Sequence, residues 1–341
     1  MTRTLRVGVA GCGYWGPNLV RNFQTLEGCE VQAVCDLDPA RVEAVRRLYP
    51  TIRAARDFEA LVQDPAVDAV VICTPVRAHY PLARAALEAG KHVLVEKPLT
   101  DSSASARALV ELAETRGRVL MVDHTFVYTG AVRKVREIIE RGDVGDLLYL
   151  DFVRVNLGLF QEDVNVLWDL GPHDVSVLSF LVPRAPQWVS AIGSAHYGAL
   201  EDHVYVTIKY EGSLIAHLHL NWLAPVKVRS TLIGGTRRMI VYDDLEPSEK
   251  VRVYEKGVTV LSDARTRERA LVDYRLGDMF APHIDKTEPL SLVCRGFRDA
   301  VLSGVPPRTG GREGLEVVRI LEAAEASIRK RGEPIPLEPR A

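Results

Sequence analysis

The stretch LRVGVAGCGYWG, residues 5–16, joins a short β-rich run to a glycine-rich turn and decides the fold. Gly11, Gly13 and Gly16 have the spacing G-x-G-x-x-G, and a helical pattern begins near Pro17. The first glycine permits a tight turn, the second lets a pyrophosphate approach the backbone, and the third lets the helix pack on the strand. This pattern predicts a dinucleotide site at the start of a Rossmann unit.

The first third of the chain alternates short β-rich runs with helical patterns, which is typical of a doubly wound parallel sheet. The runs are apolar on both sides, so helices are expected on both faces of the sheet. We therefore expect an α/β fold with a dinucleotide-binding Rossmann domain at residues 1–122. The predicted strands are residues 5–10, 30–35, 68–73, 92–96 and 118–122.

The composition of the 341-residue chain limits the class of partner. A formal net charge of -2 gives no global positive field that would hold nucleic acid or an anionic membrane. The first residues leave no room for a signal peptide, and no apolar run reaches membrane length. We expect a cytoplasmic protein whose partner is a small molecule.

Cysteine and histidine patterns bear on metal binding. The five cysteines include no C-x-x-C pair and no zinc-like spacing, so we interpret them as structural thiols. His217 and His219 alternate along a predicted strand and should share one face of the sheet. They could bind zinc, but the lack of an acid or cysteine nearby in sequence favours a half-buried face at a subunit contact.

Asp36 ends the second predicted strand, twenty positions after Gly16. An acid at this place accepts hydrogen bonds from the adenosine ribose hydroxyls and repels a 2′-phosphate, which favours NAD over NADP as the cofactor. The alternative is that Asp36 caps the next helix, although Asp38, directly before Pro39, fits that cap better.

Two further motifs, CTPVRAH at 73–79 and EKP at 96–98, each follow a predicted parallel strand. Ligands of open α/β sheets bind at this edge. Lys97 stands out because lysine is scarce in this arginine-rich chain, and its bond to Pro98 is a candidate for the cis form. The alternative is a simple polar strand exit. Besides the glycines and Asp36, the predicted cofactor-binding residues are Tyr14, Trp15, Thr74, Pro75, His79, Glu96 and Lys97.

The motif WDLGPHD, residues 168–174, places an acid and a histidine four residues apart in the middle of the chain. If a helix begins near Gly171, Asp169 and His173 can face the same direction. The alternative is an ordinary helix start, in which Asp169 caps and Pro172 occupies the first turn.

The pattern changes after residue 122, where a predicted helix at 131–141 is followed by alternating strands with hairpin-like spacing. Helices at about 289–303 and 312–330 close the chain. We expect a substrate-binding and oligomerisation domain at residues 123–341, with the site in a cleft beside the first domain.

Together these motifs resemble the Gfo/Idh/MocA family of NAD(P)-dependent sugar and cyclitol oxidoreductases. The resemblance covers nearly the whole chain and rests on GCGYWG, CTPVRAH, EKP, WDLGPHD and the closing GLEVVRILEAAEASI. It implies a Rossmann domain followed by an α/β domain with an open, mostly antiparallel sheet, through which homodimers or homotetramers form. It also implies a catalytic group of a strand-end lysine and an Asp-x-x-x-His pair, matched by Lys97, Asp169 and His173.

Oxidation of a secondary alcohol explains why these residue types are needed. Hydride moves to the nicotinamide while a proton leaves the hydroxyl, and histidine can accept a proton at neutral pH. His173 is then the general base, Asp169 orients it, and Lys97 hydrogen-bonds the reacting oxygen. A metal site of His124, Asp169 and His173 is an alternative, but hydride transfer needs no metal, and we expect none.

The loop at 154–168 leads into the catalytic motif, and its polar and aromatic residues suit a hydroxylated ring with one apolar face. Thr125 stands where relatives usually carry arginine. The overall pattern is most similar to members that act on nucleotide-linked amino sugars, such as UDP-N-acetylglucosamine-type 3-dehydrogenases. Arg154, Lys227 or Arg229 could meet a diphosphate. The predicted substrate-binding residues are His124, Tyr128, Arg154, Asn156, Trp168 and His173.

Three other functions stay open. The protein could be an inositol or free-sugar dehydrogenase, or a glycosidase of the same fold that oxidises C3 transiently and recycles its NAD. It could also be a regulatory protein that senses NAD without catalysis, although the full set of Lys97, Asp169 and His173 argues against that.

Overall fold

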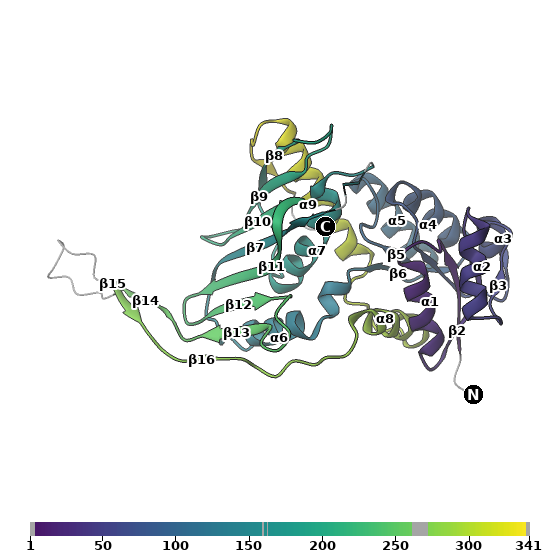
Figure 1. The fold of residues 1–341 in the computed structure, drawn as a ribbon, viewed down its shortest axis with the longest axis horizontal. Helices are drawn as coiled ribbons and strands as arrows, with labels where there is room; N and C mark the ends of the chain where they lie inside the picture. The colour runs from purple at the N-terminus through teal and green to yellow at the C-terminus, as the bar shows by residue number, and fades with distance from the viewer. Residues whose placement is uncertain (1–3, 159, 162, 261–271, 339–341) are drawn as a thin grey trace. The chain divides into compact units, whose positions relative to one another are not determined.

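The computed structural model describes residues 4–158, 160–161, 163–260 and 272–338. The chain divides into two compact units, residues 1–129 with 287–322 and residues 130–286 with 323–341, and each is described by itself (Figure 1). No helix within the described ranges has the length and apolar character needed to cross a membrane.

The first unit contains a six-stranded sheet in the order β3-β2-β1-β4-β5-β6, and every pairing in it is parallel. This order, which reverses direction between β1 and β4, is that of the Rossmann fold. The expected parallel α/β architecture is confirmed. The strands are β1 (Leu5–Ala10), β2 (Cys29–Cys35), β3 (Arg53–Ala54), β4 (Ala69–Ile72), β5 (His92–Glu96) and β6 (Leu120–Asp123).

Helices connect these strands, and side-chain caps fix where several of them begin. Asp38 accepts a hydrogen bond from the backbone N–H of Ala40, so the cap of α2 is Asp38 rather than Asp36. Helix α5 ends at Gly117, whose φ of 59° suits glycine. The helices are α1 (Gly16–Thr25), α2 (Pro39–Leu48), α3 (Phe58–Gln63), α4 (His79–Glu88) and α5 (Ser103–Arg116), with 3-10 turns η1 (Val76–Ala78) and η2 (Thr125–Tyr128).

The segment 287–322 belongs to the first unit, which differs from the expected division at residue 122. It contains α8 (Pro289–Ser303) and the start of α9 (Gly311–Arg329). Phe297 of α8 stacks edge-on against Phe23 of α1, with ring centroids 6.2 Å apart. An ion pair of 2.5 Å between Arg21 and Glu288 joins the same two helices. Burial of this apolar helix face draws the late segment back to the nucleotide-binding unit.

The second unit contains a nine-stranded sheet in the order β16-β13-β12-β11-β7-β10-β9-β8-β17. Its pairings are antiparallel except for β7 with β10, which confirms the mostly antiparallel sheet. The strands are β7 (Leu147–Leu157), β8 (Trp188–Ser194), β9 (His203–Lys209), β10 (Ile215–Asn221), β11 (Leu223–Gly235), β12 (Met239–Asp243), β13 (Val251–Tyr254), β16 (Met279–Phe280) and β17 (Ile335–Pro336); β14 (Gly257–Val260) and β15 (Val272–Arg275) form a separate pair.

The two faces of this sheet differ in burial. Along β10, Ala216, Leu218 and Leu220 are buried, and His217 and His219 alternate with them on the other face. The shared face predicted for the two histidines is confirmed. Tyr205 of β9 stacks on both imidazoles, so these rings form a half-buried patch on the face opposite the apolar core.

Helix α7 (Val166–Leu181) packs against β7, β9 and β10, while α6 (Gly130–Glu140) packs against α7. The cap of α7 is Asn165, whose side chain accepts a hydrogen bond from the backbone N–H of Trp168. The predicted start near Gly171 is therefore wrong, because Asn165 begins the helix earlier and places Pro172 inside it. Asp169 lies in the first turn, where the helix dipole favours a carboxylate.

A buried ion pair ties α7 to the sheet. Nη2 of Arg154, on β7, lies 2.7 Å from Oδ1 of Asp174, and the two side chains are only 7% and 5% exposed. Nε of Arg154 donates to the same oxygen at 2.9 Å. Removal of either partner would leave a buried charge without compensation.

We expect Arg154→Met to lower the free energy of unfolding by about 3–5 kcal/mol, because the Asp174 carboxylate loses its counter-charge. The double variant Arg154→Met with Asp174→Leu should lose clearly less unfolding free energy, because it buries no charge at this position. Urea denaturation followed by circular dichroism measures both values. Equal losses in the single and double variants would contradict a charge penalty.

Candidate functional site

The glycine-rich turn between β1 and α1 leaves no space for side chains on its inner side. Gly11 has φ +95°, and a Cβ there would lie 2.5 Å from the carbonyl oxygen of Cys73. A Cβ on Gly16 would collide with the carbonyl oxygen of Gly11. A Cβ on Gly13, in contrast, would meet only the Arg41 guanidinium at 3.6 Å. The turn therefore exposes backbone at Gly13, as the approach of a pyrophosphate requires.

Tyr14 and Trp15 occupy the exposed part of the same turn. Their rings meet edge to face with centroids 5.2 Å apart, and both side chains are exposed. Their position beside Gly13 agrees with a cofactor contact, which stays a prediction.

Asp36 supports the turn through its carboxylate. Oδ2 accepts the backbone N–H of Cys12 at 2.6 Å, and Oδ1 accepts the backbone N–H of Asp38 at 2.8 Å. An ionised carboxylate offers about four acceptor positions, so these two bonds leave capacity for ribose hydroxyls. The role of Asp36 in selecting NAD stays a prediction.

Buried polar atoms gather at the carboxyl ends of β4, β5 and β6. Thr74 Oγ1 and both ring nitrogens of His124 have no hydrogen-bond partner among the described residues, and the Glu96 and Asp123 carboxyl groups lie within hydrogen-bonding reach of each other. Buried polar atoms are nearly always paired in folded proteins, so such a group calls for a ligand or water. This edge is where open α/β sheets bind their ligands, and its polar lining fits the nicotinamide end of a dinucleotide.

Two buried acids flank Lys97 at this edge. Burial and the neighbouring Asp123 charge raise the pKa of Glu96 well above its usual value. Burial likewise raises the pKa of Asp123 to about 6, although the Thr125 hydroxyl donates to its carboxylate at 2.6 Å. The pair therefore holds a proton at higher pH than isolated carboxyls do. The Lys97–Pro98 bond is cis, as the sequence suggested.

His124 follows Asp123 and is fully buried. Burial, together with the positive charge of Lys97, lowers the pKa of His124 to about 3. Its imidazole is therefore neutral at physiological pH. Within the described ranges, no three histidine, cysteine, aspartate or glutamate side chains are arranged to hold a metal ion.

His79 is buried at the start of α4 and joins two strand exits. Its Nδ1 lies 2.8 Å from the carbonyl oxygen of Pro98, and its Nε2 lies 2.8 Å from that of Thr74. Both ring nitrogens thus face backbone oxygens, so the buried His79 side chain links the segment after β4 to the segment after β5. Its direct contact to a cofactor stays a prediction.

The remaining part of the predicted catalytic group lies on α7 in the second unit. Asp169 Oδ2 accepts a hydrogen bond from the indole Nε1 of Trp222 at 3.2 Å. Trp222 is not among the site residues predicted from the sequence, where its only signal is a tryptophan placed directly after the β10 run. The carbonyl oxygen of His173 accepts the Ser176 hydroxyl at 2.8 Å. The structure thus brings together Glu96, Lys97, Asp123 and His124 in one unit, and Asp169, His173 and Trp222 in the other.

Three predicted substrate contacts have partners within their own unit. The Arg154 guanidinium is engaged by Asp174, and the Trp168 side chain is buried. The Tyr128 hydroxyl lies 3.3 Å from Thr309 Oγ1, and burial raises its pKa to about 12. These contacts hold the fold together, and a direct role in binding substrate stays a prediction for each residue, as it does for half-buried Asn156.

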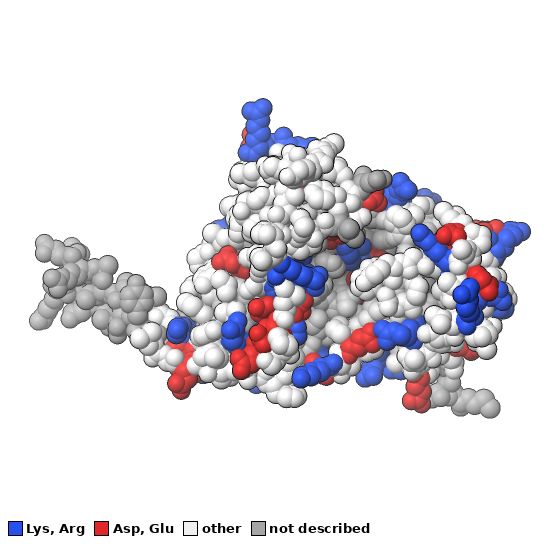
Figure 2. All heavy atoms as spheres, viewed as in Figure 1, with Lys and Arg blue, Asp and Glu red and all other residues white. Residues whose placement is uncertain are grey.

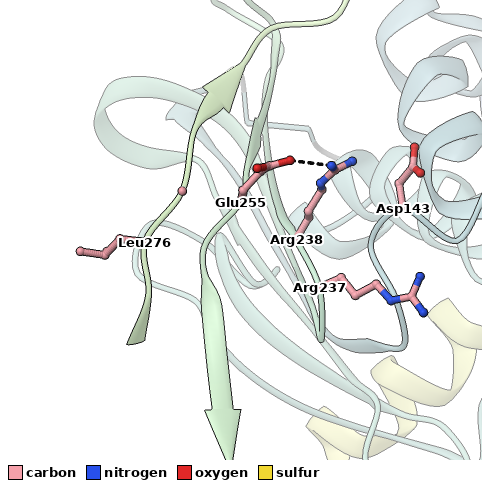
Figure 3. A pocket seen from close by; sticks show the side chains of 6 residues that line it. Asp143, Arg237, Arg238, Glu255 and Leu276 are labelled. Carbon is pink, nitrogen blue, oxygen red and sulfur yellow. Dashed lines mark hydrogen bonds and ion pairs between the residues drawn. The ribbon is translucent and has the colours of Figure 1, made fainter. Parts of the chain in front are cut away.

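A surface hollow of about 380 Å³ lies elsewhere in the second unit and contains none of the predicted site residues. Arg238 and Glu255 pair across it at 2.5 Å, while the Leu276 side chain points away (Figure 3). On the face shown in Figure 2, basic and acidic side chains are interspersed rather than gathered in one basic patch. Neither feature indicates an alternative site for a nucleic acid. The hollow is lined by Asp143, Arg237, Arg238, Glu255, Leu276 and Gly277.

Comparison with known proteins places both halves of the chain in one family. Residues 5–124 match the model described as the oxidoreductase family with an NAD-binding Rossmann fold, and residues 132–241 match the Gfo/Idh/MocA C-terminal domain. The chain therefore belongs to the Gfo/Idh/MocA family of oxidoreductases and contains an NAD-binding Rossmann domain.

Individual relatives are distant in sequence. The chain is 25% identical over 347 residues to scyllo-inositol 2-dehydrogenase (NADP(+)) IolW of Bacillus subtilis, covering 96% of this chain and 95% of that protein. It is 28% identical over 273 residues to dTDP-3,4-didehydro-2,6-dideoxy-alpha-D-glucose 3-reductase of Saccharopolyspora spinosa, covering 76% and 82%. The solved structure of UDP-N-acetylglucosamine 3-dehydrogenase GnnA from Acidithiobacillus ferrooxidans superposes with a TM-score of 0.81 at 24% identity, covering 96% and 98%, which shows a shared fold.

We expect buried His124 to make the protein less stable in acid. Its pKa is about 3 when folded and near ~6.5 when unfolded, so the unfolded chain binds more protons below pH ~6.5. The stabilising contribution is complete above that pH and is lost as the pH falls. Between pH 7 and pH 4 the wild type should lose roughly 3 kcal/mol more unfolding free energy than His124→Gln.

Urea denaturation at a series of pH values measures this difference. His283→Gln, which removes an exposed histidine, is the matched control and should follow the wild type. Parallel pH profiles for the wild type and His124→Gln would show that the imidazole is not held neutral by burial.

Proposed function

We propose that this protein is an NAD-dependent sugar dehydrogenase that moves hydride between a secondary alcohol of a nucleotide-linked amino sugar, at C3, and nicotinamide. The observation that carries the proposal is the group of buried polar atoms around Lys97, at the same strand edge as the glycine-rich turn. The names of two relatives, a UDP-N-acetylglucosamine 3-dehydrogenase and a dTDP-sugar 3-reductase, favour a nucleotide sugar over a free sugar.

NAD held at the glycine-rich turn would supply the hydride acceptor for oxidation of the carbinol carbon to a carbonyl carbon. His173 takes the hydroxyl proton, and Asp169 orients the imidazole. The Lys97 ammonium donates a hydrogen bond to the reacting oxygen. The Glu96 and Asp123 pair lies beside Lys97, and its raised pKa values limit the negative charge buried next to the ammonium. Reduction of a ketone runs through the same residues in reverse.

We also propose that the open face of the nine-stranded sheet joins copies of the chain into a homodimer or homotetramer. Tyr205, His217 and His219 form a patch of stacked rings there, and Leu232 adds an exposed apolar side chain. Exposed clusters of aromatic and apolar side chains are typical of protein contacts.

A substrate screen tests the function. Free sugars, inositols and UDP-sugars are offered with NAD, and NADH formation is followed by absorbance. Oxidation of a UDP-sugar supports the proposal, whereas exclusive oxidation of inositols would replace it with a cyclitol dehydrogenase, the activity named for the Bacillus relative. Release of an aglycone without net NADH would indicate the glycosidase.

We expect NAD to bind at least about tenfold tighter than NADP, because the Asp36 carboxylate accepts ribose hydroxyls and repels a 2′-phosphate. Asp36→Ser should reduce this ratio, although part of the loss in NAD affinity will come from the bond to Cys12. Asp38→Ser, which keeps a helix cap, is the control and should preserve the ratio. Calorimetric affinities that are equal for the two dinucleotides in the wild type would refute the assignment.

We expect Lys97→Met and His173→Asn each to lower kcat by about 100-fold or more, because proton transfer and stabilisation of the reacting oxygen are lost. NAD affinity, measured by calorimetry, should be retained in His173→Asn, because His173 is not among the predicted cofactor contacts. Lys134→Met removes a lysine paired with Glu137 on α6 and serves as the control. Wild-type turnover in either variant would remove that residue from the mechanism.

A further inference from the structure

Three aromatic side chains in the second unit, Phe160, Tyr197 and Trp222, form a continuous cluster that we call the aromatic wall. The ring centroid of Phe160 lies 5.5 Å from that of Trp222 and 6.2 Å from that of Tyr197. The side chains become more exposed along this series, from Trp222 at 2% through Phe160 at 45% to Tyr197 at 77%. The wall therefore begins in the core and ends in solvent.

The inner end of the wall touches the predicted catalytic pair. The buried indole of Trp222 donates its Nε1–H to Asp169 Oδ2 at 3.2 Å. Asp169 has few ways to turn away while this bond holds, since Trp222 is itself fixed by packing. The inner end of the aromatic wall therefore contacts Asp169, the residue that we propose orients His173.

The outer end of the wall is fixed through its backbone. Asp202 is buried, and its Oδ2 accepts the backbone N–H groups of His196 at 2.7 Å and Tyr197 at 3.1 Å. Its Oδ1 lies 2.7 Å from His196 Nδ1. A buried carboxylate is costly unless it is well hydrogen-bonded, so these three contacts anchor the loop firmly. The exposed Tyr197 side chain thus projects from a rigid backbone.

Backbone bonds of Trp222 connect both ends. Its N–H donates to the carbonyl oxygen of Asp202, and its carbonyl oxygen accepts the N–H of Gly158, each at 2.9 Å. A Cβ on Gly158 would lie 2.6 Å from the indole Cδ1, so the backbone of Gly158 lies directly against Trp222. Three segments distant in sequence are joined at one tryptophan.

Exposed aromatic faces on a fixed backbone suit one class of ligand. The negative face of an aromatic ring attracts the C–H groups of a sugar ring, and it also stacks on a nucleobase. We propose that Phe160 and Tyr197 form a stacking site for a ring of the sugar substrate, and that Trp222 is a positioning residue for Asp169. The inference rests on the proposed function, because Asp169 and His173 define where the oxidised ring lies.

Binding experiments with Phe160→Ala and Tyr197→Ala test the stacking site in the full-length protein. The probes are UDP-N-acetylglucosamine, UDP and N-acetylglucosamine 1-phosphate, measured by calorimetry. We expect each variant to bind UDP-N-acetylglucosamine about tenfold more weakly or worse. Phe280→Ala removes a similarly exposed ring from β16, which is separated from β9 and β10 in the sheet order, and should leave binding unchanged.

The truncated probes identify which ring is stacked. A loss that also appears with UDP assigns the wall to the nucleobase, and a loss that appears with the sugar phosphate assigns it to the pyranose. The proposed stacking site is wrong if both variants bind all three probes as the wild type does. It is also wrong if the wild type binds none of the probes. If sugars are oxidised with unchanged KM in both variants, the wall fails and the proposed function stands. If the wild type oxidises no sugar but both variants lose binding of the probes, the proposed function fails and the stacking site stands.

Trp222→Phe tests the positioning role, because it removes the indole N–H and keeps an aromatic ring in the core. We expect kcat to fall about tenfold or more with KM unchanged. The variant loses the hydrogen bond to Asp169 in the predicted catalytic pair and changes no predicted substrate contact. Trp188→Phe makes the same change in β8 and is the control. A wild-type kcat in Trp222→Phe, or an equal fall in both variants, would reduce Trp222 to a packing residue.

Discussion

The close approach of backbone to backbone at the β1–α1 turn is the constraint on which the nucleotide-binding unit depends. Gly11 and Gly16 leave no room for a side chain, and Asp36 holds the same turn by accepting the N–H of Cys12. The start of α1 is thereby fixed at the edge of the sheet, where the positive end of the helix dipole can receive phosphate. The polar edge at β4, β5 and β6 is useful only because this turn sets where the dinucleotide begins.

The two units use buried charge in opposite ways. In the second unit Arg154 and Asp174 compensate each other, and the pair fixes α7 on the sheet. In the first unit Glu96 and Asp123 are buried beside each other, and burial raises the pKa values of both. The first arrangement stabilises the fold, whereas the second holds a proton at the strand edge where the nicotinamide is proposed to bind.

Local patterns in the sequence were enough to predict the parallel sheet, the glycine-rich turn, the mostly antiparallel second sheet and the cis bond before Pro98, because each depends on neighbouring residues. The start of α7 was misplaced since Gly171 and Pro172 suggested a helix start, while Asn165 supplied the cap. The return of 287–322 to the first unit depends on contacts across the chain, such as Phe23 with Phe297. The roles of Trp222 and Asp202 were not predicted for the same reason, because the neighbouring sequence does not indicate which residues they contact.

Within the nine-stranded sheet, the parallel pairing of β7 with β10 has a consequence for how such a protein can change. Parallel neighbours need a long crossover, and here the chain between β7 and β10 passes Phe160 and α7, re-enters the sheet as β8, and reaches Tyr197 in the β8–β9 connection. Insertions or deletions in the loops of this segment alter the surroundings of α7 while the register of β7 and β10 is preserved. Selection can therefore remodel ligand preference in one continuous segment of the gene and leave the dinucleotide half untouched.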